Sequence, residues 1–200
     1  MLERKSHVPE LFLWHVFESL LAAVHYCHTG PTDQHPGTWD PIYHRDIILG
    51  NVLLISHDSP DTPYSTVKLA DFGCAMSRYE VEENHFKVED LPEACESALA
   101  PEGAVASAAA DVWQVGLTVL RLLAATQLNC EEIKLDMKQL VEYFDKYSDS
   151  HMWDLRHLLG MCVSKDPANR PTAEQLLHEV RKRRSELMCL GKLKFEALRL

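Results

Sequence analysis

Three short strings of the sequence carry side chains whose types and spacing could do chemistry together. The first reads His-Arg-Asp over residues 44–46, with Asn51 five residues after its aspartate. The second reads Asp-Phe-Gly over residues 71–73, and the third reads Ala-Pro-Glu over residues 100–102. Carboxylate and amide oxygens are the hard ligands that Mg²⁺ prefers. One such tripeptide arises easily by chance, whereas three in this order, with these gaps, indicate a shared site.

The three strings resemble the catalytic loop, the magnesium loop and the end of the activation segment of eukaryotic protein kinases. Residues 111–116 resemble the start of the central helix of the kinase C-terminal lobe, and residues 166–171 resemble its closing signature. The resemblance covers residues 1–184. It implies a protein kinase-like C-terminal lobe of the serine/threonine type, in a family that transfers the γ-phosphate of ATP to protein hydroxyl groups.

The resemblance implies roles for four residues of the site. Asp46 matches the catalytic base, which orients the attacking hydroxyl. Asn51 and Asp71 match the side chains that hold Mg²⁺ against the phosphates of ATP, and Leu53 matches the floor of the adenine pocket. The expected catalytic residue is therefore Asp46. The expected ATP-binding residues are Asn51, Leu53 and Asp71, of which Asn51 and Asp71 are also the expected metal ligands.

Other matched residues have structural roles in the family. Asp111 would cap the backbone of the catalytic loop. Arg170 would form a buried ion pair with Glu102, and breaking such a pair costs about 3–5 kcal/mol. His44 and Phe72 would pack on each other. These contacts would support the site without taking part in the reaction.

Arg45 leaves two interpretations open. It could order a phosphorylated activation segment, in which Ser77, Tyr79 and Ser97 carry the hydroxyl groups, or it could be a cation on a surface loop. The acidic residues at positions 80, 82 and 83 would repel an added phosphate.

Two parts of the catalytic machinery depart from the family pattern. Ile48 stands where serine/threonine kinases carry a lysine that neutralises the transferring phosphate. Removal of one such preorganised donor lowers a rate by about 10²–10³-fold. Cys95 and Ala98 stand where hydroxyl residues are expected, so the hydroxyl contacts to the catalytic aspartate would be missing. We therefore expect impaired catalysis and poor positioning of the substrate.

The motifs of the ATP-gripping N-terminal lobe, such as G-x-G-x-x-G, are missing from the sequence. An apolar floor around Leu53 would then be exposed and would invite a partner. Three hypotheses remain open: an active kinase completed by a longer chain or a partner, a pseudokinase that serves as a scaffold, and an inactive truncated fragment. The expected partners are accordingly a protein substrate or docking partner and an N-terminal lobe supplied by a longer chain.

Apolar spacing predicts the first elements that would position these residues. Residues 9–28 have the pattern of an amphipathic helix, and residues 32–41 that of a loop. Residues 52–55 and 66–70 are predicted to be two short strands of a hairpin. From Asp111 to Ala125 the sequence is apolar on nearly every helical face, which predicts a helix buried on all sides.

The second half of the chain is predicted to be helical after an irregular segment. Residues 74–99 show no clean period and are expected to be irregular and mobile. Apolar residues between 152 and 162 predict another amphipathic helix, and Thr172 with Gln175 fits a capping box at the start of the last one. The expected fold is mainly α with a small β hairpin. Residues 1–184 would form the kinase-like domain, and residues 185–200 a C-terminal extension.

Composition excludes several classes of protein. The chain has 200 residues, 46% of them hydrophobic, which suffices for one core. Its formal net charge of -10 argues against a nucleic-acid partner. Its six cysteines form no C-x-x-C pair, which favours a reduced compartment over a disulfide scaffold. No apolar run is long enough to span a membrane. We therefore expect an intracellular protein of the cytoplasm or nucleus, with no membrane or nucleic-acid partner.

Overall fold

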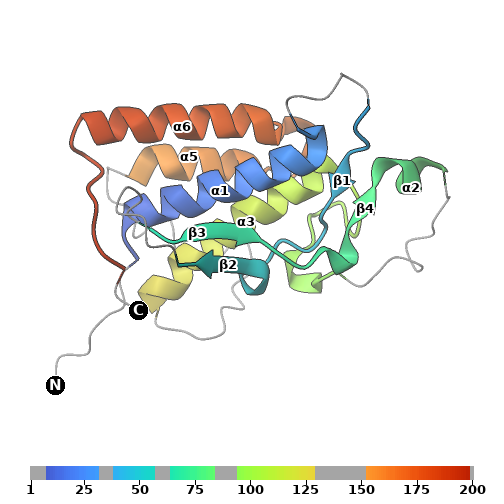
Figure 1. The fold of residues 1–200 in the computed structure, drawn as a ribbon, viewed down its shortest axis with the longest axis horizontal. Coiled ribbons are helices and arrows are strands. Elements are labelled where there is room, and N and C mark those ends of the chain that lie inside the picture. The colour runs from blue at the N-terminus through green and yellow to red at the C-terminus, as the bar shows by residue number, and fades with distance from the viewer. Residues whose placement is uncertain (1–7, 32–37, 57–63, 84–93, 129–151, 199–200) are drawn as a thin grey trace.

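Four long helices make up most of the described chain, namely α1 (Glu10–Thr29), α3 (Ala108–Leu128), α5 (Trp153–Cys162) and α6 (Ala173–Cys189). The computed structural model describes residues 8–31, 38–56, 64–83, 94–128 and 152–198. Helix α1 contacts both α6 and α3, and α3 also contacts α5, so the helices form one bundle (Figure 1). No helix within these ranges has the length and apolar character needed to cross a membrane.

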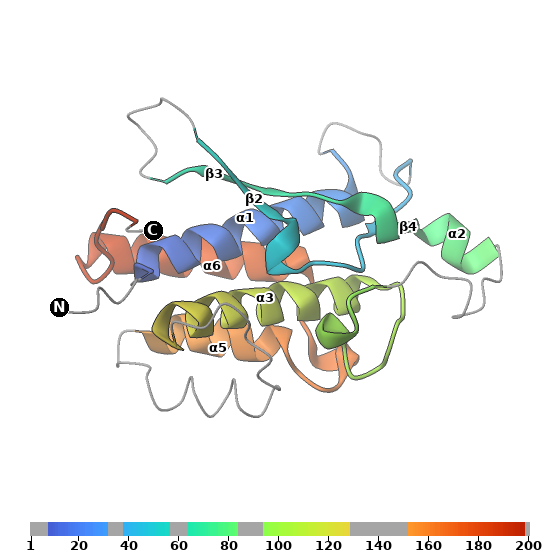
Figure 2. The ribbon, with the colours of Figure 1, turned by 90° about the horizontal axis from the view of Figure 1, so that it is seen from below.

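Two small antiparallel sheets lie beside this bundle. Strands β2 (Val52–Ile55) and β3 (Thr66–Leu69) form the predicted hairpin. Strands β1 (Ile42–Tyr43) and β4 (Met76–Ser77) form a second sheet. Figure 2 shows β2 and β3 on the side of α1 that faces away from α5. The expectation of a mainly α fold with a small β hairpin is confirmed. The second sheet was not predicted, because its two-residue strands are too short for a period and lie far apart in the sequence.

Helix α1 begins and ends within one residue of its predicted bounds. The four apolar residues of the predicted stripe are all buried, namely Leu13, Phe17, Leu20 and Val24. Gly30 ends the helix with a φ of 78°, a conformation that side chains other than glycine rarely adopt. A Cβ atom at Gly30 would also lie 2.5 Å from Cγ of Trp39, whose indole Nε1 donates to the carbonyl of Cys27. The turn after α1 therefore requires glycine.

Helix α3 is the buried centre of the bundle, as its sequence predicts. Every residue from 111 to 120 is buried. Gly116 allows α3 to approach α5 closely, because a Cβ atom there would lie 2.5 Å from Cβ of Cys162. The polar side chains of a helix buried in this way need hydrogen-bond partners. For α3 these partners are backbone groups of residues 44–47.

Helix α6 begins at the predicted capping box. Gln175 N donates to Thr172 Oγ1 at 3.2 Å, and Thr172 N donates to Gln175 Oε1 at 2.9 Å. The helix continues to Cys189, so the expected boundary at residue 184 falls inside it. Leu187 and Leu193 beyond that boundary are buried in the main core. In the described part of the chain, residues after 184 therefore share the core of the bundle.

The expectation for residues 74–99 is wrong over residues 76–83. This stretch forms strand β4 and helix α2 (Arg78–Glu83). Ser77 and Glu80 form a capping box at the start of α2, with Ser77 N donating to Glu80 Oε2 at 2.8 Å and Glu80 N donating to Ser77 Oγ at 3.2 Å. The signal was present in the sequence as Ser-x-x-Glu. Residues 84–93 of this segment, and residues 32–37 of the predicted loop, lie outside the described residues.

Replacement of Gly116 by alanine tests the close approach of α3 and α5. The new methyl group would overlap Cys162 and Val163, so we expect the free energy of unfolding to fall by about 1–3 kcal/mol. Gly160→Ala is the matched control, because a Cβ atom at Gly160 meets no atom within 4 Å. Alanine there should raise stability by up to about 1 kcal/mol through helix propensity. Urea unfolding measures both changes, and equal midpoints for the two variants would contradict the packing argument.

Candidate active site

Three polar side chains of α3 hold the backbone of the loop that contains Asp46. The carboxylate of Asp111 accepts hydrogen bonds from the amides of His44 and Arg45, each at 2.9 Å. Gln114 accepts from the amide of Ile47 at 3.0 Å and donates to the carbonyl of Arg45 at 2.7 Å. Thr118 donates to the carbonyl of Ile47 at 2.7 Å. The backbone of three loop residues, His44, Arg45 and Ile47, is therefore fixed to a rigid helix on both sides of Asp46.

The role expected for Asp111 is confirmed, and Gln114 and Thr118 are supports that sequence reasoning missed. Their signal was available, because these three polar residues recur at spacings of three and four along an otherwise apolar helix. Their side chains are almost fully buried, and buried polar groups need partners. A polar stripe on a buried helix thus predicts a bound backbone segment, although it does not say which segment.

His28 is another missed support, and it comes from α1. Its Nε2 lies 2.9 Å from Oδ2 of Asp111, the same oxygen that accepts from the amide of His44. Because a carboxylate can only accept, His28 must carry the proton on Nε2. Its ring also lies edge-on to Tyr43, with centroids 5.8 Å apart. Helices α1 and α3 therefore meet the loop at one carboxylate.

Asp46 and Asn51 contact each other directly. The side-chain nitrogen of Asn51 donates to the carbonyl of Asp46 at 2.9 Å and to its Oδ2 at 3.0 Å. Both bonds engage the nitrogen, so the amide oxygen of Asn51 remains as an acceptor, which is the atom that a cation ligand needs. Within the described residues that oxygen has no hydrogen-bond partner. The geometry of Asn51 therefore fits the expected magnesium ligand.

Asp71 lies in a strained backbone conformation. Its φ of 61° and that of Arg45, 68°, are the positive values among non-glycine residues of the described chain. Such conformations persist where the surrounding structure enforces them, and they concentrate at functional sites. Oδ1 of Asp71 accepts from the amide of Gly73 at 3.1 Å, and the side chain is exposed. A hard carboxylate oxygen is thus accessible, as Mg²⁺ coordination requires.

His44 connects the Asp46 loop to the Asp71 loop. Its Nε2 donates to the carbonyl of Ala70 at 3.1 Å, and its Nδ1 lies 3.4 Å from the amide of Asp46. Its ring packs on Phe72 with centroids 4.6 Å apart, as expected. Burial lowers the pKa of His44, although the negative charge of Asp111 opposes that shift. A neutral imidazole suits these bonds, because one nitrogen donates and the other accepts.

Leu53 and Phe72 are exposed apolar side chains that follow Asn51 and Asp71 closely in the sequence. Leu53 is 48% exposed and Phe72 is 47% exposed. Strand β2 continues directly from Asn51 at the end of the catalytic loop, so Leu53 lies two residues from the expected metal ligand. The structure therefore brings Asp46, Asn51 and the His44–Phe72 pair together, with Leu53 beside them.

Arg45 is not a cation on the surface, so the second of its two interpretations is wrong. Its side chain is buried, and its Nη1 donates to the carbonyl of Cys74 at 3.0 Å. Burial lowers the pKa of Arg45, while Cys74 and Asp111 nearby raise it. Its Nε has no hydrogen-bond partner among the described residues. The ordering of a phosphorylated segment stays a prediction.

The segment before residue 100 contacts Asp46 through its backbone. Cys95 N donates to Oδ1 of Asp46 at 3.0 Å. Cys95 therefore supplies through the main chain a contact to the aspartate that was expected to need a hydroxyl group.

Ile48, by contrast, brings no charge to the loop. No lysine or arginine of the described residues forms an ion pair with Asp46.

Glu102 and Arg170 form the expected buried ion pair. Two parallel bonds join them, from Nη1 to Oε1 at 2.6 Å and from Nη2 to Oε2 at 2.7 Å. The guanidinium also lies 5.0 Å from the ring centroid of Trp113 and donates to the carbonyl of Ala109 at 3.0 Å. Burial raises the pKa of Glu102, but the hydrogen bond and the positive charge of Arg170, together with a backbone hydrogen bond, outweigh burial and lower the pKa overall. The pair ties the end of this segment to α3.

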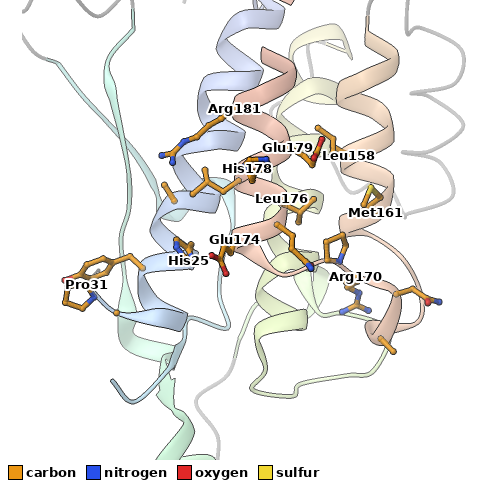
Figure 3. Close-up of a pocket in the computed structure, with 18 residues that line it drawn as sticks. His25, Pro31, Leu158, Met161, Arg170, Glu174, Leu176, His178, Glu179 and Arg181 are labelled. Atoms are coloured by element: carbon orange, nitrogen blue, oxygen red, sulfur yellow. The ribbon is translucent and has the colours of Figure 1, made fainter. Parts of the chain in front are cut away.

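A large surface hollow lies elsewhere on the bundle. It measures about 1170 Å³ and is lined by α1, α5 and α6. Figure 3 shows His25 of α1 beside Glu174 of α6, with Leu158 and Met161 on the α5 side. None of the four expected site residues lines it. The hollow and the candidate site are therefore separate features.

Replacement of Asp111 by asparagine tests the central support of the loop. The amide would turn one acceptor into a donor, leaving at least one buried N–H without a partner. We expect the free energy of unfolding to fall by about 1–3 kcal/mol. Asp40→Asn is the control, because the Asp40 carboxylate accepts a backbone bond from Tyr79 where solvent reaches it. Urea unfolding measures both, and equal losses would show that Asp111 has no special role.

Comparison with known proteins agrees with this geometry. A serine/threonine-protein kinase KIC1 of Saccharomyces cerevisiae is 25% identical over 87% of this chain and 15% of its own length. MAP3K epsilon protein kinase 1 of Arabidopsis thaliana is 33% identical over 68% of this chain and 10% of its own length. A membrane-associated tyrosine- and threonine-specific cdc2-inhibitory kinase of Drosophila melanogaster is 29% identical over 92% of this chain.

The match extends along most of the chain but covers a minor part of these relatives. The chain spans 32% of the length of the Drosophila kinase and less of the other two. The sequence model of the protein kinase domain matches residues 1–180, which include every string and support described above. The chain therefore belongs to the protein kinase family.

Proposed function

We propose that this chain is the C-terminal lobe of a serine/threonine-type protein kinase, which transfers the γ-phosphate of ATP to protein hydroxyl groups once an ATP-gripping lobe completes the site. The observation that carries the proposal is the contact between Asp46 and Asn51, with His44 reaching from Asp46 to the residue before Asp71. Phosphoryl transfer asks a protein chiefly for positioning and charge neutralisation. These groups are placed for both tasks.

The residues of this chain would divide those tasks. Asp46, with each carboxylate oxygen already held by one hydrogen bond, keeps further acceptor capacity for the hydroxyl of a protein substrate. The amide oxygen of Asn51 and the carboxylate of Asp71 would hold Mg²⁺. When bound, Mg²⁺ neutralises charge on the phosphates of ATP. Leu53 would contact the adenine ring.

A second function, that of a pseudokinase scaffold, is favoured by Ile48. An apolar side chain replaces the charge that the loop needs during transfer, while every support of the loop is retained. Such a protein would keep its fold and its docking surfaces but transfer phosphate slowly or not at all. The two functions differ in one measurable property, which is the rate of transfer.

Titration of the 200-residue chain with ATP and Mg²⁺ tests the nucleotide site. The described chain offers a floor for adenine and two metal ligands, so we expect no saturation below millimolar ATP. Any weak binding should disappear in Asp71→Ala. The control is Asp166→Ala, because Asp166 also accepts an amide bond at the start of a short 3-10 helix but lies outside the site. Micromolar affinity that Asp71→Ala abolishes would show that the chain grips ATP unaided.

Restoration of the missing charge tests the catalytic proposal in a longer, active form of the protein. We expect Ile48→Lys to raise the rate of transfer by up to about 10²-fold, since one preorganised donor contributes this much. Leu49→Lys adds the same charge at the neighbouring, exposed position and should leave the rate unchanged. Initial rates on a protein substrate measure both variants. A rate unaltered by Ile48→Lys would mean that another cation already neutralises the phosphate.

A further inference from the structure

Arg121 is a charged side chain of α3 that has no part in the contacts described so far. It follows Thr118 by three residues, so it continues the stripe of polar residues that supports the catalytic loop. Thr118 donates to the carbonyl of Ile47, the neighbour of Asp46. Three residues of a helix advance about 4.5 Å along its axis. Arg121 therefore lies on the same face of α3 as the loop supports, one turn beyond the last of them.

The guanidinium of Arg121 reaches the segment before residue 100. Its Nη2 donates to the carbonyl of Ser97 at 2.6 Å. Ser97 belongs to a short 3-10 helix (Glu96–Ala98), which Cys95 precedes directly. The Cys95 amide donates to Asp46, and Cys95 Sγ lies 3.3 Å from Ser97 Oγ. One short turn of chain thus connects Arg121 with the expected catalytic aspartate.

The contact with Ser97 uses little of what the Arg121 side chain offers. A guanidinium has five N–H groups, and this contact engages Nη2 alone. Nε is buried and has no hydrogen-bond partner in the described part of the chain. A bond to one carbonyl also needs no charge, because a neutral donor would suffice. The positive charge of Arg121 is therefore not explained by the fold.

The missing complement of Arg121 is a carboxylate. Arg121 forms no ion pair with any described residue, although Glu96 adjoins its partner Ser97. Burial lowers the pKa of Arg121, and the nearby Cys95 raises it. A partly buried cation is costly until an anion pairs with it, and a guanidinium can hold a carboxylate by two parallel bonds. The side chain is also partly exposed, so a ligand can reach it.

We propose that Arg121 determines substrate specificity by pairing with a carboxylate of the protein substrate close to the acceptor hydroxyl. The inference rests on the proposed function, because it assumes that Asp46 receives that hydroxyl. Cys95 and Ser97, which link the two sites, are two residues apart. An extended peptide advances about 3.3 Å per residue, so the carboxylate lies about two or three residues from the acceptor. The substrate class is a polypeptide with acidic residues beside the serine or threonine that is modified.

Peptide binding to the 200-residue chain tests this without nucleotide. Two labelled peptides of alanine and glutamine carry a central serine, with either glutamate or lysine two and three residues away on both sides. The net charge of -10 favours the lysine peptide at every surface, so the measured quantity is the ratio of the two dissociation constants from fluorescence polarisation. We expect Arg121→Gln to shift this ratio about 10-fold toward the lysine peptide. Arg121→Lys keeps the charge and should shift it by less than about 3-fold.

Lys182→Gln is the matched control, because it removes the same charge at an exposed position of α6 outside the site. It should leave the ratio within about 2-fold of the original, since salt screens distant charges. Equal shifts in Lys182→Gln and Arg121→Gln would overturn the inference, because net charge alone would then set the preference. A shift in Arg121→Lys as large as in Arg121→Gln, or no binding of either peptide, would also overturn it.

Two further features of the experiment keep its result separate from other causes. Urea unfolding verifies that the Arg121 variants are folded, so that a changed ratio reports binding. The assay contains no ATP, so its failure leaves the nucleotide experiment untouched. Failure of ATP binding, in turn, does not alter the ratio measured with the peptides.

Discussion

The carboxylate of Asp111 is the constraint on which the candidate site depends. It accepts two backbone amides of the catalytic loop and the imidazole of His28, so α1, α3 and the loop meet at one buried charge. A buried carboxylate is costly unless its acceptors are filled, and here the loop supplies the missing donors. Folding of the helix bundle and formation of the loop are therefore coupled. Strain at Arg45 and Asp71 can persist because this coupling fixes the residues between the helices.

The ion pair of Glu102 and Arg170 is a second buried contact, and it joins the end of the segment before residue 103 to another side of α3. Removing one partner of a buried pair leaves an uncompensated charge, at about 3–5 kcal/mol. Because Arg170 also reaches Trp113 and the carbonyl of Ala109, the pair fixes the end of the segment that carries Cys95. The amide of Cys95 in turn contacts Asp46. The two ion-paired or hydrogen-bonded charges thus act on the same aspartate through different segments, Asp111 through residues 44 and 45 and Glu102 through the segment that carries Cys95.

Local patterns in the sequence predicted the long helices and the hairpin, because burial leaves a periodic record in apolar residues. They could not predict β1 and β4, whose pairing joins distant residues with little local preference. The three strings predicted where chemistry lies, and Asp111 was expected to support them. Gln114 and Thr118 were missed although they form a polar stripe with Asp111 on an otherwise apolar helix. His28 was missed because its partner lies on another element and leaves no local trace in the sequence. The burial of Arg45 was likewise a tertiary outcome that its place beside the catalytic aspartate does not determine.

The contacts that hold the catalytic loop in place are different from the charged group that phosphoryl transfer needs at position 48. The supports that Asp111, Gln114 and Thr118 give the loop involve backbone groups that do not depend on the residue at position 48. Ile48 can therefore replace a charged side chain without disturbing the fold, and catalysis can be lost while the loop geometry is kept. The exposed apolar residues of β2 are likewise not needed for the bundle to form, because they lie outside its core. What the bundle does not need for its own stability is available for a nucleotide, a substrate or a partner lobe.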